Sequence, residues 1–115
     1  MTVPRRYAIV LPAYLAALLA IDTQVSLDGQ LALGVLTFAV LTGALWPLAP
    51  LVRAQAVGVV LFATIGEVTG SILWGVYHYR LHNLPTFVPP AHGIVYLTGL
   101  DQTIRAFTIP GRPVP

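Results

Sequence analysis

The sequence contains no cysteine and no lysine, and charged residues make up only 9% of its 115 residues. The absence of cysteine excludes disulfide bonds, thiolate catalysis, Fe–S clusters and cysteine-ligated zinc. Soluble domains carry about 25% charged residues, whereas hydrophobic residues make up 57% of this chain. The six basic residues are arginines that occur singly or as one pair, without a basic stripe. The composition therefore predicts one integral membrane domain, residues 1–115, with no nucleic-acid partner.

A long apolar segment at residues 54–79 carries a single carboxylate, Glu67, at its midpoint. With a rise of ~1.5 Å per residue, a helix over this range is roughly 39 Å long and can cross a ~30 Å hydrocarbon layer. A glutamate at that depth is costly unless it is protonated or has a polar partner. We therefore expect a transmembrane helix with one side turned away from lipid.

Three further helices are expected, at residues 7–27, 31–51 and 90–108, which gives an all-α, four-helix transmembrane bundle. The first segment also has the basic start and short apolar core of a secretory signal peptide, but it lacks a clear cleavage site and another hydrophobic segment follows, so a retained helix is favoured. The fourth segment is interrupted by Asp101 and Arg105, whose spacing allows an ion pair. The alternative is a three-span protein whose last segment lies on the membrane surface.

The arginines predict an orientation for this bundle. Three prolines make the segment 80–90 a stiff, extended connector on the outer side. With four spans, only Arg80 lies on that side, whereas five arginines lie on the other: Arg5, Arg6, Arg53, Arg105 and Arg112. By the positive-inside tendency, both termini are cytoplasmic in a multi-pass protein of the bacterial inner membrane type.

A polar stripe runs along the third expected helix. At ~100° per residue, Ser71, Trp74 and His78 lie within roughly 40° of Glu67. The stripe predicts an outward-opening pocket whose binding residues are Glu67, Ser71, Trp74, Tyr77, His78 and His92. In the alternative interpretation, Glu67 is protonated or paired with another helix and serves packing alone. The surrounding aromatic residues are typical of the belt at a membrane boundary, and they are Trp74, Tyr77, Tyr79, Phe87 and Tyr96.

Two further patterns occur near Glu67. His78 and His82 have the i,i+4 spacing of a helical metal site, with His92 as a third ligand. Because no HExxH motif is present, we interpret these histidines as interfacial polar residues and predict no metal site. Gly66 and Gly70 form a GxxxG pattern, which predicts close packing of another helix beside Glu67.

The segment from Glu67 through Gly70 to the run Trp74-Gly75-Val76-Tyr77-His78-Tyr79 resembles the Glu…Gly…aromatic-Gly-x-Tyr-x-Tyr segment of membrane carotenoid hydratases. The resemblance covers about thirteen residues, with a different internal spacing, in a chain much shorter than those enzymes. It implies that an isoprenoid-like, lipophilic molecule meets the polar stripe.

Two classes of function are open. The favoured hypothesis is a noncatalytic accessory subunit that packs against other membrane protein subunits and contacts membrane lipid or a pigment, because the chain is short and shows no complete catalytic set. The alternative is a membrane enzyme or carrier for a hydrophobic, isoprenoid- or lipid-like substrate, with Glu67 as acid or base assisted by His78 or His92. The sequence identifies no cofactor.

Overall fold

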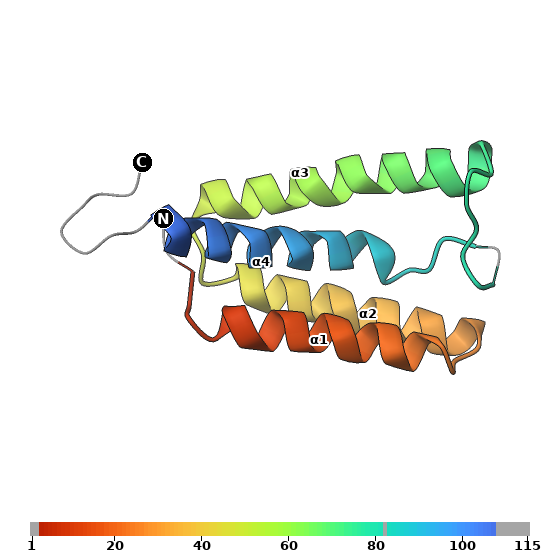
Figure 1. Cartoon of the computed structure of the whole chain (residues 1–115), viewed down its shortest axis with the longest axis horizontal. Coiled ribbons are helices and arrows are strands. Elements are labelled where there is room, and N and C mark those ends of the chain that lie inside the picture. The colour runs from red at the N-terminus through yellow and green to blue at the C-terminus, as the bar shows by residue number, and fades with distance from the viewer. Residues whose placement is uncertain (1–2, 82, 108–115) are drawn as a thin grey trace.

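The computed structural model describes residues 3–81 and 83–107, the last three of these by their backbone alone. These residues form α1 (Tyr7–Asp22), α2 (Leu27–Leu45), α3 (Pro50–Glu67), the π-helix η1 (Val68–Leu73) and α4 (Val88–Phe107), and they contain no strand. The helices run alternately in opposite directions, with short turns after α1 and α2 and a longer connector, residues 74–87, before α4 (Figure 1). The prediction of an all-α, four-helix chain is confirmed.

The fourth helix occupies the centre of the bundle. It packs against α1, α2 and α3, most extensively against α3 (Figure 1). Ile94 and Leu97 are fully buried and join a core that includes Leu11, Leu41 and Val52. This position differs from the three-span alternative, in which the last segment lies on the membrane surface.

The helix boundaries differ from the predicted ones: α1 ends at Asp22 instead of residue 27, and α2 ends at Leu45 instead of residue 51. α2 begins at Leu27, so Asp28 lies in its first turn, where a negative charge favours the helix. α3 begins at Pro50, because proline has no N–H and fits the first turn. The helical structure that follows ends at Leu73 instead of residue 79.

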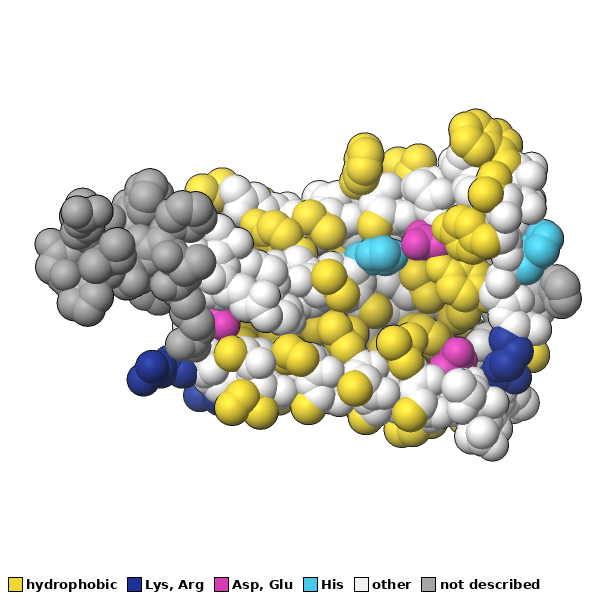
Figure 2. Space-filling model, in the orientation of Figure 1, with side chains coloured by type: hydrophobic (Ala, Val, Ile, Leu, Met, Phe, Trp, Pro, Cys, Tyr) yellow, Lys and Arg dark blue, Asp and Glu magenta, His cyan; other side chains and the backbone are white. Residues whose placement is uncertain are grey.

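Two helical segments, Leu27–Leu45 and Pro50–Leu73, are long and apolar enough to cross a membrane, and α1 is apolar but shorter. Within Pro50–Leu73 only 11% of the most apolar window is buried inside the bundle. Large hydrophobic side chains such as Phe62, 81% exposed, therefore point away from the protein. Hydrophobic side chains are spread along the described part of the face shown in Figure 2.

The connector is fixed to the turn between α1 and α2 by polar contacts. Arg80 donates hydrogen bonds to the main-chain carbonyls of Asp22, at 2.6 Å, and Val25, at 2.5 Å. The side-chain amide of Gln30 donates to the carboxylate of Asp22 at 2.8 Å. The main-chain carbonyl of Gln30 accepts a hydrogen bond from the Thr86 hydroxyl at 2.9 Å. These contacts close the end of the bundle opposite the first and last described residues.

Asp101 of α4 is buried, with 2% of its surface exposed. Its expected partner Arg105 has no described side chain, and Arg112 lies outside the described residues. The ion pair predicted between Asp101 and Arg105 therefore stays a prediction.

Candidate functional site

Glu67 is the last residue of α3, at the point where the α-helix widens into the π-helix η1. The Trp74 N–H bonds to the carbonyl of Thr69, five residues earlier. The Ser71 hydroxyl donates to the main-chain carbonyl of Glu67 at 2.6 Å. Short π-helical segments are rare and occur often at functional sites, so the local backbone marks Glu67 as a candidate.

The connector then returns two tyrosines to Glu67. Gly75 has φ +64°, a left-handed conformation that glycine adopts without a Cβ penalty, and the chain reverses there. The hydroxyls of Tyr77 and Tyr79 both donate to Oε2 of Glu67, the second at 2.5 Å. An ideal Cβ built on Gly70 would lie 2.8 Å from the Tyr77 ring, so a glycine there lets the ring lie against η1.

The other carboxylate oxygen faces α4. Nε2 of His92 lies 3.2 Å from Oε1 of Glu67, and the side chains are 35% and 19% exposed, respectively. When Nε2 carries a proton it donates to Glu67, and the neutral ring then keeps Nδ1 as an acceptor. Each oxygen of Glu67 therefore faces at least one hydrogen-bond donor, and residues far apart in sequence meet at one carboxylate.

The tyrosine hydroxyls remain donors in this arrangement. Burial, together with the hydrogen bond to Glu67, raises the pKa of Tyr79 well above its usual value. The hydrogen bond to Glu67 is the main cause that raises the pKa of Tyr77. Both phenols thus keep their protons throughout the neutral range, and both continue to hold the carboxylate of Glu67.

A cleft of about 320 Å³ opens beside this cluster, between α1 and α4. Glu67, Tyr79, His92 and Asp22 contribute its polar groups. The rest of the lining is hydrophobic and consists of Leu15, Leu18, Leu19, Phe87, Val88, Ala91 and Val95. Figure 2 shows a histidine beside an acidic side chain, with hydrophobic side chains around them, on the visible face. Such a lining suits an apolar molecule with one polar group.

The structure brings only part of the predicted stripe together. Glu67, Tyr77 and His92 meet, and Ser71 bonds to the main chain of Glu67. The prediction that Trp74 and His78 continue the same helical face is wrong, because the helix ends at Leu73. Trp74 is 76% exposed, and His78 lines a separate pocket.

Gly66 and Gly70 are not covered by another described helix, and His78 lies outside the helical segments. A Cβ on Gly66 would meet nothing within 4 Å, and Gly70 is approached by Tyr77 of the connector. No helix among the described residues packs at these glycines. His78 follows the helix, so it does not form a helical pair with His82, which is outside the described residues. In the part of the chain that is described, no three His, Asp or Glu side chains are placed to hold a metal ion.

Tyr79 is the site residue that sequence reasoning missed. The sequence pattern predicts a place in an aromatic belt, whereas the Tyr79 hydroxyl donates to Glu67. The available signal was the pair of tyrosines that follows Gly75, since a reversal at a glycine brings later residues back toward the helix.

No protein-family model, curated protein or solved structure matches this chain.

Proposed function

We propose that this chain is a multi-pass protein of a bacterial-type plasma membrane that binds a lipophilic, isoprenoid- or lipid-like molecule in the cleft at Glu67. The observation that carries the proposal is the Glu67 carboxylate, held by two tyrosines and a histidine, on the wall of a mostly hydrophobic cleft. An apolar chain can lie along the α1 and α4 side chains while its polar end meets the His92–Glu67 pair.

The membrane environment is supported by the outward-facing side chains of α1, α2 and α3. Exposed large hydrophobic residues include Ile9 on α1, Val35 on α2 and Ile65 on α3. Soluble monomers rarely expose contiguous apolar patches above a few hundred Å². Lipid is the solvent in which such a surface carries no penalty.

Co-purification tests the ligand. The protein is extracted in a mild detergent, and the bound lipophile is quantified by mass spectrometry after organic extraction. We expect a near-stoichiometric lipophile in the wild type and about tenfold less in Glu67→Gln, since a hydrogen bond to a charged group contributes about 1.5–3 kcal/mol. Asp28→Asn removes the same charge from the exposed start of α2 and should retain the ligand. Equal occupancy in both variants would contradict the proposal.

The same extraction separates binding from catalysis. In a binding protein or carrier, the recovered molecule is identical before and after incubation with the wild type. In an enzyme, it is converted by the wild type and left unchanged by Glu67→Gln. His92 and Glu67 lie within hydrogen-bond distance, as a general acid and base do. The experiment therefore distinguishes binding alone from conversion.

The second candidate, an accessory subunit of a larger membrane complex, is favoured by the surface of α3. Val52 and Ala56 are its only buried side chains, and it packs almost entirely against α4. A Cβ on Gly58 or Gly66 would meet open space, so a helix of another subunit has room to approach. Native sizing in mild detergent tests this role. A larger complex that dissociates with Gly66→Leu, and persists with Gly99→Leu on α4, supports it.

A further inference from the structure

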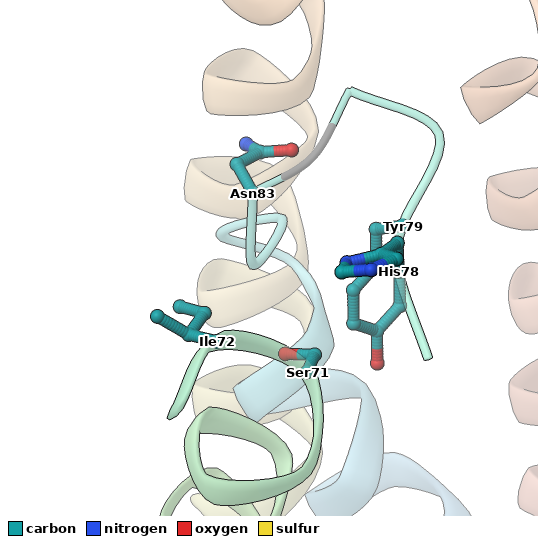
Figure 3. Close-up of a pocket in the computed structure, with 5 residues that line it drawn as sticks. All are labelled: Ser71, Ile72, His78, Tyr79 and Asn83. Atoms are coloured by element: carbon teal, nitrogen blue, oxygen red, sulfur yellow. The ribbon is translucent and has the colours of Figure 1, made fainter. Parts of the chain in front are cut away.

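A second, more polar pocket lies at the connector end of the bundle. Its volume is about 220 Å³, and Ser71, Ile72, His78, Tyr79 and Asn83 line it. Figure 3 shows Ser71 and Ile72 on η1, with His78, Tyr79 and Asn83 placed around them by the connector. A water molecule occupies about 30 Å³ of liquid, so the pocket has room for several.

Asn83, one of the lining residues, has a polar atom without a partner. Its Oδ1 is buried and has no hydrogen-bond partner among the described residues. The amide nitrogen of Asn83 donates to the Gln30 side chain at 3.3 Å. Leaving a buried polar atom unsatisfied costs about 1–3 kcal/mol. The Ser71 hydroxyl uses its proton on the Glu67 carbonyl and keeps its lone pairs as acceptors. The Ser71 hydroxyl therefore offers the pocket an acceptor for a small hydrogen-bond donor such as water.

Tyr79 connects this pocket with the cleft. It lines both, and its hydroxyl donates to Oε2 of Glu67 at 2.5 Å. A phenol oxygen that accepts a proton from hydronium in the pocket can pass its own proton to the carboxylate, and His92 lies 3.2 Å from the other oxygen. In this transfer hydronium becomes water, Tyr79 is regenerated and Glu67 gains one proton.

We propose that the polar pocket is a water site through which Glu67 exchanges protons with the aqueous phase at the connector end, with Tyr79 as the link. The proposal rests on the membrane arrangement proposed above. It makes the ligand cleft responsive to the pH on one side of the membrane.

The titratable groups around Glu67 come from three elements. Tyr77 and Tyr79 belong to the connector, and His92 belongs to α4. From α1, Asp22 lines the same cleft, and it is held by Gln30 and by Arg80 at 3.9 Å. Of these groups, only Tyr79 lines both the pocket and the cleft.

Thiol labelling tests whether water reaches the pocket. The chain has no cysteine, so single-cysteine variants have no background. In proteoliposomes, Ser71→Cys should react with a small membrane-impermeant thiol reagent from the connector side only. Thr64→Cys replaces a hydroxyl that also bonds to a carbonyl four residues earlier, but deeper in α3, and should stay unlabelled.

A reference variant separates the two proposals. Val76→Cys lies on the exposed connector and should react from that side in every case. If Val76→Cys reacts from one side and Ser71→Cys from neither, the water site is wrong and the membrane arrangement stands. If Val76→Cys reacts equally from both sides of sealed, uniformly oriented vesicles, the membrane arrangement itself is wrong.

Proton transfer is tested with two matched variants. Tyr77→Phe and Tyr79→Phe each remove one hydrogen bond to the same oxygen of Glu67, but only Tyr79 lines the water pocket. After rapid acidification, the infrared carboxyl band of Glu67, identified as the band lost in Glu67→Gln, reports protonation. We expect Tyr79→Phe to slow protonation about tenfold or more, because a positioned proton donor is lost, and Tyr77→Phe to change it little. Equal rates in the two variants would overturn the link.

Discussion

Gly75 determines whether the two tyrosines can reach Glu67. Its φ of +64° places it in the left-handed region, which costs other residues roughly 1–2 kcal/mol. Gly75 lets the chain reverse after η1, and this reversal brings the hydroxyls of Tyr77 and Tyr79 back to Glu67. A change at this residue therefore acts on the site without touching the cleft lining.

We expect Gly75→Ala to destabilise the connector by roughly 1–2 kcal/mol and to reduce the bound lipophile. Gly66→Ala is the matched control, because a Cβ there meets nothing within 4 Å and alanine gains up to about 1 kcal/mol in a helix. Thermal unfolding in detergent and ligand occupancy measure both effects. Equal loss of occupancy in the two variants would show that the reversal does not position the site.

The residues of the site were only partly predictable from sequence. An isolated acid in a long apolar segment indicates Glu67 directly, and His92, near the start of the next expected helix, is predicted as a binding residue that assists Glu67. Tyr79 is not, because its contact depends on where the helix ends. Hydropathy does not mark that end, since the apolar sequence continues past Leu73 to Tyr79.

The helix α4 has a weak sequence signal for a membrane span, yet it occupies the centre of the bundle. Its polar residues would be costly in contact with lipid, but α3 offers two of them hydrogen-bond partners. His92 meets Glu67, Tyr96 donates to Gln55 at 2.6 Å, and Asp101 is buried. The composition of α4 is poorly suited to a helix that faces lipid. The helix forms because it packs against α1, α2 and α3 instead. Its position between the other helices could not be derived from its own sequence.

Close packing of α4 depends on Gly93. A Cβ there would lie 2.8 Å from a methyl group of Leu41 and 3.0 Å from one of Val60, whereas a Cβ on Gly99 would meet nothing within 4 Å. We expect Gly93→Val to destabilise the bundle by about 1–3 kcal/mol, the usual cost of overpacking. Gly99→Val should have a much smaller effect. Unfolding in detergent followed by circular dichroism compares the two, and equal destabilisation would contradict the central packing of α4.

The whole molecule has an asymmetric distribution of arginine. Arg5 and Arg6 precede α1 and Arg53 lies in the first turn of α3, so these three belong to one end of the bundle. Arg80 lies at the other end, where it holds the turn after α1. In a membrane, the end richer in arginine is retained on the cytoplasmic side. The fold thus has two ends that the proposed membrane arrangement assigns to different compartments.

Because successive helices run in opposite directions, the turns after α1 and α2 are expected on opposite sides of the membrane. Ser26 lies in the turn after α1 and Ala49 in the turn after α2, both exposed and at opposite ends. In intact cells, we expect an impermeant thiol reagent to label Ser26→Cys and to reach Ala49→Cys only after the membrane is opened. Labelling of both variants in intact cells would contradict the spanning of α2. The reverse result, with Ala49→Cys labelled and Ser26→Cys protected, would preserve the bundle but show that the arginines do not set its orientation, and the water pocket beside Ser71 would then open to the cytoplasm.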